Sequence, residues 1–298
     1  MSKILIIRPS ALGDTLLLGP ALRQLSDSEE ITLAGRIPGV DFLRPFLKNC
    51  IDYERGGWHT IFSERPDCDK IPTVESDMVI SFLSDPLGAA QRGLQACFKN
   101  VPVFSFPPFP LKKEKIHTAL YLALCLKNSG LPVNPEKAVE SAVKKPLFCK
   151  QNILKPAKAF VIHPGSGSKK KNYPSDFWLD LINGLKPALL NNLTILLGPA
   201  ELSRQKDLTK KLSAQGLNIV KSPNKEGLLS IFRKVSLYIG HDSGITHLAA
   251  MTGVHTIALF KNSCATQWSP IGPYVTLFNN LKSPEIIYKI IEDQLAGA

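Results

Sequence analysis

Short apolar runs alternate with amphipathic stretches along the whole chain, which predicts strand–helix–strand units with buried parallel sheets. The first series predicts strands at residues 3–8, 31–35, 77–83 and 101–106, with helices near 14–25, 86–98 and 115–129. The second series predicts strands at residues 158–163, 193–198, 217–220, 235–240, 254–260 and 274–278, with helices between them. Two doubly wound α/β sheets fit these two series better than one sheet of about 11 strands.

A stretch without a sustained period separates the two series. Residues 131–156 contain several prolines and lysines, a composition typical of a linker or a domain crossing. We therefore expect an N-terminal domain over residues 1–150 and a C-terminal domain over residues 151–280. Isoleucines at helical spacing predict an amphipathic helix within residues 281–298.

Composition is compatible with this division. A chain of 298 residues with 44% hydrophobic residues can bury either one large core or two ordinary cores. Its 36 Lys and Arg residues against 25 acidic residues give a net charge of +11, which favours anionic partners such as nucleotides, phosphates, nucleic acid or an anionic membrane face. The first 150 residues carry 19 basic and 16 acidic side chains and the remainder 17 and 9, so we expect anion binding in the second half.

Cysteine usage and hydropathy indicate a cytoplasmic protein. No C-x-x-C spacing occurs among the cysteines, so we expect reduced thiols rather than a zinc site or a disulfide framework. The cysteines are Cys50, Cys68, Cys97, Cys125, Cys149 and Cys264. No leader precedes the first apolar run, and the longest such stretches fall short of the ~20 residues that span a bilayer. We expect a soluble or peripherally attached protein.

In open parallel sheets, ligands bind beyond the carboxyl ends of the strands, where helices begin with free backbone N–H groups. The first such junction is "IRPSALGDTLLLGPAL", in which Gly13 permits a tight turn and Asp14 projects where a helix begins. Asp14 is either the N-cap of that helix or a catalytic carboxylate.

The second junction is "VIHPGSGSKKKNYPSDFW". Gly165 and Ser166 begin a run of small residues that permits close backbone approach, and three lysines follow, so the loop suits a diphosphate. It matches neither the Walker pattern nor the G-x-G-x-x-G dinucleotide fingerprint. The pattern is equally compatible with a solvated turn.

The third junction, "LLGPAELSRQ", places Glu201 at the start of a helix after a strand. A carboxylate there can accept hydrogen bonds from ribose hydroxyls. It can equally be favourable through the helix dipole alone.

The fourth junction lies within "LYIGHDSGITHLAAMTGVHTIALF". Ser243 and Gly244 leave backbone N–H groups bare at a helix start, where a diphosphate could lie. Either Asp242 or Ser243 can cap this helix. Asp242 would repel a diphosphate, so we expect it to cap or to bind sugar hydroxyls. His247 either donates to phosphate or packs as a buried histidine.

Together, in this order and spacing, the four junctions resemble glycosyltransferase family 9, the bacterial ADP-heptose:lipopolysaccharide heptosyltransferases. The resemblance covers nearly the whole chain and is strongest in "KILIIRPSALGDTLLLGPAL", "VIHPGSGSKKKNYP", "GPAE" and residues 238–260, with a weaker match at "QWSPIG". It implies the GT-B fold, two Rossmann-like domains with parallel sheets facing an interdomain cleft. It also implies a C-terminal helix over residues 281–298 that packs back toward the N-terminal domain.

The resemblance implies an inverting, metal-independent transfer without a cofactor. The N-terminal domain would bind a lipopolysaccharide core or related acceptor. Asp14 would be the general base, because a carboxylate with an ordinary pKa of about 4 is ionised at neutral pH. The C-terminal domain would bind the nucleotide-sugar donor, with ADP-heptose as the expected donor.

The donor-binding residues also follow from the resemblance. The diphosphate would be stabilised by the loop at Gly165 and Ser166, by Lys171, and by the N–H groups around Ser243 and Gly244. Glu201 carries over to the ribose. Asp242 and His247 carry over to the region of the donor sugar and phosphate.

The sequence departs from the family pattern at two single residues and one three-residue loop. His241 and Tyr173 stand where the family commonly has Asn and Trp, and Lys261-Asn262-Ser263 replaces a Gly-Pro-Thr. The last of these loops is expected near the nucleotide. The nucleotide and the sugar are therefore less tightly implied than the fold.

The segment at residues 104–117 mixes aromatics with Lys112, Lys113 and Lys115. It is either a solvated loop or a contact for a lipid-linked glycan or the inner membrane face. Three other functions remain open: transfer of another nucleotide-linked sugar, non-catalytic nucleotide-sugar binding, and RNA binding. The RNA-binding motifs are absent, so we expect no nucleic-acid partner.

Overall fold

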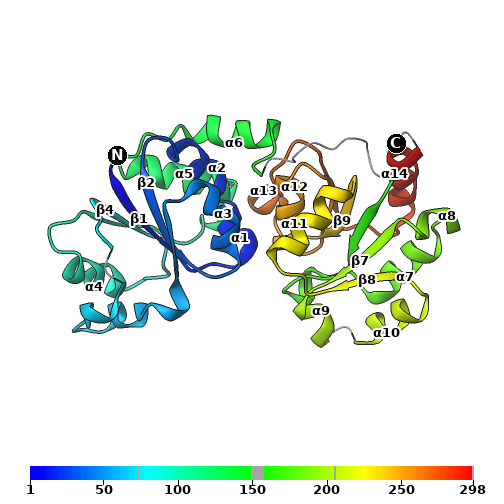
Figure 1. Cartoon of the computed structure of the whole chain (residues 1–298), viewed down its shortest axis with the longest axis horizontal. Coiled ribbons are helices and arrows are strands. Elements are labelled where there is room, and N and C mark those ends of the chain that lie inside the picture. The colour runs from blue at the N-terminus through cyan, green and yellow to red at the C-terminus, as the bar shows by residue number, and fades with distance from the viewer. Residues whose placement is uncertain (73, 149–157, 205, 297–298) are drawn as a thin grey trace. The chain divides into compact units, whose positions relative to one another are not determined.

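The computed structural model of the protein, which describes residues 1–72, 74–148, 158–204 and 206–296, forms two compact units (Figure 1). They comprise Met1–Ser141 and Ala142–Ala298. The expected boundary at residue 150 lies outside the described residues. Each unit is built on a parallel sheet.

The first unit contains a five-stranded sheet in the order β3-β2-β1-β4-β5. Its strands are β1 (Lys3–Arg8), β2 (Glu30–Gly35), β3 (Asn49–Asp52), β4 (Met78–Ser81) and β5 (Val103–Ser105). The four strands predicted in this half are confirmed. The edge strand β3 escaped prediction because its side chains are exposed or half-buried, so its sequence is not an apolar run.

Short helices surround this sheet. They are α1 (Leu12–Leu16), α2 (Gly19–Leu25), α3 (Gly39–Leu43), α4 (Ala89–Cys97), α5 (Thr118–Asn128) and α6 (Pro135–Lys144). The single helix predicted at residues 14–25 is divided into α1 and α2, because Pro20 has no N–H to donate to the carbonyl four residues earlier. The linker alternative for residues 131–156 is wrong where α6 forms, whereas the domain-crossing alternative agrees with the division between Ser141 and Ala142. The apolar residues of α6 do recur at helical spacing, at Ala138, Val139, Ala142 and Val143, but the prolines and lysines on both sides of this short run concealed the pattern.

The second unit contains a six-stranded sheet in the order β11-β10-β9-β6-β7-β8. Its strands are β6 (Phe160–His163), β7 (Leu193–Leu197), β8 (Asn218–Lys221), β9 (Leu237–His241), β10 (His255–Phe260) and β11 (Val275–Asn279). All six predicted strands are confirmed. They are easily recognised because most of them are buried on both faces and therefore continuously apolar.

The helices of this unit complete its core. They are α7 (Ser175–Asn183), α8 (Pro187–Leu190), α9 (Pro199–Arg204), α10 (Lys206–Ala214), α11 (Lys225–Lys234), α12 (Gly244–Met251), α13 (Ala265–Trp268) and α14 (Glu285–Ala296). The predicted C-terminal helix is present as α14, and Ile287, Ile291 and Leu295 bury one face of it in the core that contains Trp178. Its expected packing toward the N-terminal domain stays a prediction. None of the described helices combines the length and apolar character needed to cross a membrane.

Each sheet reverses its strand order at one position. In the first unit the reversal lies between β1 and β4, and in the second between β6 and β9. The connections leave these strands in opposite directions, so the loops at their carboxyl ends diverge and leave space for a ligand. A ligand-binding site is therefore expected at these two positions.

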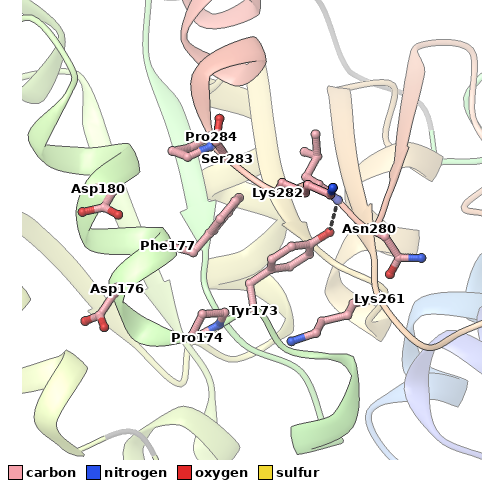
Figure 2. A pocket seen from close by; sticks show the side chains of 11 residues that line it. Tyr173, Pro174, Asp176, Phe177, Asp180, Lys261, Asn280, Lys282, Ser283 and Pro284 are labelled. Carbon is pink, nitrogen blue, oxygen red and sulfur yellow. Dashed lines mark hydrogen bonds between the residues drawn. The ribbon is translucent and has the colours of Figure 1, made fainter.

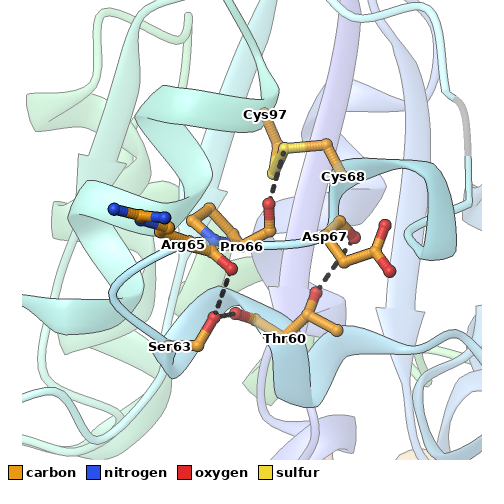
Figure 3. The surroundings of a disulfide bond; sticks show 7 residues. All are labelled: Thr60, Ser63, Arg65, Pro66, Asp67, Cys68 and Cys97. Atoms are coloured by element: carbon orange, nitrogen blue, oxygen red, sulfur yellow. Dashed lines mark hydrogen bonds between the residues drawn. A yellow bond between two sulfur atoms is a disulfide. The ribbon is translucent and has the colours of Figure 1, made fainter.

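A disulfide joins Cys68 and Cys97 in the first unit (Figure 3). The loop around Cys68 is also held by the Thr60 hydroxyl, which donates to the Asp67 carbonyl at 3.3 Å. The expectation of reduced thiols is wrong for this pair. A separation of 29 residues forms no sequence motif, and the pairing arises only because the loop folds against α4.

Removing the disulfide should destabilise the first unit. Cross-linking a loop of about 30 residues restricts the unfolded chain, so C68S/C97S should lower the free energy of unfolding by about 3 kcal/mol. Urea denaturation measures this difference. Dithiothreitol should bring the wild type to the stability of the variant and leave the variant unchanged; a wild type insensitive to dithiothreitol would contradict the prediction.

Candidate functional site

The candidate site lies where β6 and β9 run side by side in the second unit. His163 ends β6 opposite Gly240, and His241 ends β9. The loop at residues 164–174 follows β6, and Asp242 and Ser243 connect β9 to α12. The strand pairing therefore brings together two predicted junctions that are far apart in the sequence.

The loop after β6 is organised by its own side chains. Ser166 is 5% exposed, and its hydroxyl donates to Asn172 Oδ1 at 2.6 Å. Between these two residues, Lys169–Lys171 form a single 3-10 turn. The loop is thus closed by a hydrogen bond across its base, which presents the lysines at its outer end.

Lys171 joins this loop to the end of β9. Its Nζ lies 2.6 Å from Asp242 Oδ2, and Asp242 is 5% exposed. The preceding residues Lys169 and Lys170 are exposed. On the other side of the carboxylate, the buried His247 places Nε2 4.0 Å from Asp242 Oδ1. A nearly buried carboxylate therefore lies between an ammonium group and an imidazole.

Ser243 caps α12, since its Oγ accepts a hydrogen bond from the Thr246 N–H at 3.4 Å. The alternative that Asp242 is the cap is wrong. Gly244 begins the helix and is partly exposed. The first N–H groups of a helix lack partners within it, so this terminus can bind an anion next to the Lys171–Asp242 pair.

Glu201 lies in the first turn of α9 and is 2% exposed. Its Oε2 accepts from the Gly198 N–H at 2.7 Å and lies 3.4 Å from His163 Nε2. Burial raises the pKa of this carboxyl group, but the hydrogen bond and charge of His163 and the backbone N–H groups outweigh burial and hold the pKa below its ordinary value. Glu201 is therefore an ionised acceptor held in one orientation.

Gly165 makes room for that carboxylate. A Cβ atom at residue 165 would lie 1.9 Å from Glu201 Oε1. The backbone of the β6–α7 loop therefore passes directly over Glu201, an approach that only glycine allows.

The three departures from the family pattern contact one another. The rings of Tyr173 and His241 stack with centroids 5.6 Å apart, and the Tyr173 N–H donates to His241 Nε2 at 2.7 Å. Burial is the main cause that lowers the pKa of His241 to about 3, so this imidazole is neutral. Lys261 places Nζ 5.6 Å from the centre of the Tyr173 ring and donates to the Asn172 carbonyl at 3.4 Å.

A cavity of about 480 Å³ opens beside Tyr173 (Figure 2). Its lining consists of Tyr173, Pro174, Asp176, Phe177, Asp180, Lys261, Asn280, Leu281, Lys282, Ser283 and Pro284. Tyr173 forms part of the wall, and its hydroxyl accepts from the Leu281 N–H at 2.7 Å. The lining contains no predicted site residue and has charges of both signs, so it does not select a diphosphate.

In the first unit, Asp14 lies in the first turn of α1, beyond the carboxyl end of β1. Ala11 is the N-cap of this helix, so the alternative that Asp14 caps it is wrong. The fully buried Arg8 donates through Nε and Nη2 to the Asp14 carbonyl at 3.3 and 3.2 Å, and through Nη1 to the Pro108 carbonyl at 2.8 Å. Arg8 thus fixes the backbone that carries Asp14.

The segment at residues 104–117 is partly built around Arg8. The guanidinium lies 5.5 Å from the centre of the Phe109 ring, while Lys112, Lys113 and Lys115 are exposed. At least one aromatic side chain of the segment therefore packs onto a buried cation, and its lysines face solvent.

The structure brings together most of the predicted donor-site residues within the second unit. Gly165 contacts Glu201, and Lys171 contacts Asp242, next to His247. Asp14 belongs to the first unit. Sequence reasoning missed three residues that support the site: Arg8, which binds the Asp14 carbonyl, His163, which contacts Glu201, and Tyr238, which contacts His163. The only signal for each was a polar group within an apolar strand.

Within the described residues, no three His, Cys, Asp or Glu side chains are grouped to hold a metal ion.

Comparison with known proteins supports an assignment. The model of glycosyltransferase family 9 (heptosyltransferase) matches residues 91–294, more than half of the chain. A Haemophilus influenzae protein described as a candidate glycosyltransferase is 24% identical over an alignment of 304 residues. The alignment covers 91% of this chain and 86% of that protein.

Two solved structures share the fold. Escherichia coli heptosyltransferase WaaC with ADP gives a TM-score of 0.69 at 13% identity, over 98% of this chain and 99% of that chain. Escherichia coli ADP-heptose lps heptosyltransferase II gives a TM-score of 0.64 at 14% identity, over 99% of each chain. The expected fold of two Rossmann-like domains with parallel sheets, as in these GT-B enzymes, is confirmed.

Gly165→Ala should destabilise the second unit. The added Cβ overlaps the Glu201 carboxylate, which must leave its hydrogen bonds, so we expect a loss of about 2 kcal/mol in the free energy of unfolding. Gly167→Ala is the matched control, because its Cβ would have no atom within 4 Å. Urea denaturation of both variants checks the difference, and equal stabilities would show that Gly165 is not required for packing.

Proposed function

The chain belongs to glycosyltransferase family 9, and from that premise we propose that it transfers heptose from ADP-heptose to a lipopolysaccharide core or related surface glycan. We further propose that the transfer inverts the anomeric configuration. The resemblance to a heptosyltransferase with ADP supports this choice of donor. The resemblance to an ADP-heptose lps heptosyltransferase supports the proposed acceptor.

The Lys171–Asp242 contact carries the donor-site proposal. It joins the β6–α7 loop to the residues that precede α12, so a cation and the free N–H groups of a helix N-terminus lie within one small region. A diphosphate needs both kinds of partner. Glu201, an ionised acceptor beneath the same loop, is suited to ribose hydroxyls.

Departure of the nucleoside diphosphate is the step that Lys171 would assist. Negative charge grows on the diphosphate as the bond to the anomeric carbon breaks, and Lys171 with the N–H groups around Gly244 would stabilise it. Asp242 is half of an ion pair, so it could accept hydrogen bonds from sugar hydroxyls while Lys171 turns toward the diphosphate. His247, beside Asp242, would donate to the same region. The proposed reaction therefore needs no divalent metal and no cofactor.

Asp14 is the proposed general base. It follows a strand whose carboxyl end lies at the reversal point of the first sheet, the position where such folds bind ligands. Its carboxylate would accept the proton of the acceptor hydroxyl as that oxygen attacks the anomeric carbon. The hydrogen bonds from Arg8 to the Asp14 carbonyl would hold it in place during this attack.

A lipid-linked acceptor would place the reaction in the cytoplasm, at the inner face of the membrane. The exposed Lys112, Lys113 and Lys115 could then contact acceptor phosphates or anionic lipid. This peripheral contact is part of the proposal.

Transfer of a different nucleotide-linked sugar is the second candidate. One specific observation favours it. His241, Tyr173 and Lys261, which differ from the family pattern, contact one another beside the β6–α7 loop, so the three could together alter which donor is bound. A non-catalytic nucleotide-sugar binder would use the same contacts but would consume no donor.

Thermal shift against ADP-, UDP-, GDP- and TDP-sugars tests the donor, and ADP-heptose should raise the melting temperature most.

Lys171→Ala should weaken ADP binding by about tenfold, because a charge-assisted contact to phosphate is lost. Lys170→Ala is the matched control, since this neighbouring lysine is exposed. Equal ADP affinity in the two variants would remove Lys171 from the phosphate site.

Asp14→Asn should abolish most transfer while donor binding persists. Loss of a general base lowers turnover by a factor of about 100 to 10,000, whereas the ADP contacts lie in the other unit. Release of ADP in the presence of a lipopolysaccharide-core acceptor measures turnover, with the exposed Asp27→Asn as control. Unchanged turnover in Asp14→Asn would exclude Asp14 as the base. NMR of the product separately shows whether the anomeric configuration is inverted or retained.

A further inference from the structure

A buried chain of hydrogen bonds connects Glu201 with the N-terminus of α12. His163 lies between Glu201 and Tyr238, with Nε2 3.4 Å from Glu201 Oε2 and Nδ1 3.0 Å from the Tyr238 hydroxyl. The chain continues from Tyr238 to Thr246 Oγ1 at 3.1 Å, and from Thr246 to Ser243 Oγ at 3.0 Å. Tyr238 is the central member and is fully buried.

Counting hydrogens assigns a direction to each bond. The Thr246 hydroxyl has one hydrogen, which it donates to the His241 carbonyl through a short contact. Thr246 Oγ1 therefore accepts from both Tyr238 and Ser243. Because the Tyr238 hydrogen points to Thr246, the Tyr238 oxygen accepts from His163 Nδ1–H. His163 Nε2 faces the Glu201 carboxylate, which can only accept, so Nε2 also carries a hydrogen and donates it to Glu201.

The surrounding residues fit a hydroxyl rather than a plain ring at residue 238. The ring itself packs edge-on against Phe232, with centroids 5.8 Å apart, an environment that would suit phenylalanine equally well. A Cβ atom at residue 240 would lie 2.5 Å from the Tyr238 hydroxyl, so Gly240 leaves the space that the hydroxyl occupies. Burial raises the pKa of Tyr238 and so keeps the phenol protonated, as its hydrogen bond to Thr246 requires.

We propose that Tyr238 is a positioning residue that sets His163, and through it Glu201, for recognition of the donor ribose. This inference rests on the proposed function, in which Glu201 binds the ribose. Without the hydroxyl, His163 Nδ1 loses its acceptor, and the ring that contacts Glu201 is free to turn. The same hydroxyl orients Thr246 and so ties the ribose end of the site to the Ser243 cap at the phosphate end.

Tyr238→Phe tests the proposal because it removes one oxygen and keeps the shape of the core. Isothermal titration calorimetry with ADP, 2′-deoxy-ADP and 3′-deoxy-ADP gives the preference for the intact ribose. Glu201→Gln supplies the value expected when the carboxylate is lost. We expect Tyr238→Phe to reduce the preference about fivefold, toward that of Glu201→Gln.

Tyr288→Phe is the matched control. It also removes a hydrogen-bonded phenol, whose hydroxyl donates to the Asp180 carbonyl at 2.6 Å on α7. We expect this variant to keep the wild-type preference. A general loosening of the fold would weaken the binding of all three nucleotides by the same factor and leave the ratios of their affinities unchanged. Unchanged affinity ratios in Tyr238→Phe would therefore overturn the inference.

The design separates this inference from the function on which it rests. If the wild type bound no ADP, the proposed function would fail, and the role of Tyr238 would fail with it. If ADP bound and Glu201→Gln lost the ribose preference while Tyr238→Phe retained it, the function would stand and the role of Tyr238 would be excluded.

Discussion

The contact between Lys171 and Asp242 is the interaction on which the candidate site depends. The adjacent strands β6 and β9 have their carboxyl ends side by side, and this ion pair ties the loops that follow them. A carboxylate that is 5% exposed would be costly without a cation, so the pair makes an acidic residue tolerable beside a helix N-terminus suited to anions. Glu201, held under the same loop, completes the arrangement.

The ion pair also explains how an acidic residue and an anionic ligand could share one site. A bound diphosphate would compete with Asp242 for Lys171, and the carboxylate would then need other donors. Sugar hydroxyls and the nearby His247 could provide them. In the proposed reaction Lys171 and Asp242 would each exchange one partner for another, and neither charge would be left unpaired.

The sequence predicted the strands of both sheets well, because continuous apolar runs are the pattern of buried parallel strands. It located the polar junctions but could not choose among local alternatives. Asp14 looked like a helix cap, whereas Ala11 occupies that position, and of the two candidate caps Asp242 and Ser243 only the structure selects Ser243. The Cys68–Cys97 disulfide and the contacts of His163 depend on side chains far apart in the sequence. Such pairings leave no periodic pattern, so only the fold reveals them.

His241, Tyr173 and Lys261 show how a departure from a family pattern is best interpreted. Taken singly, each looks like an isolated substitution. In the structure the His241 imidazole stacks on the Tyr173 ring and accepts a hydrogen bond from the Tyr173 backbone N–H, and the Lys261 ammonium group lies near the same ring. A change at one of the three would leave a buried nitrogen or an aromatic face without its partner. The three residues are therefore coupled, and any effect on donor choice belongs to the group rather than to one side chain.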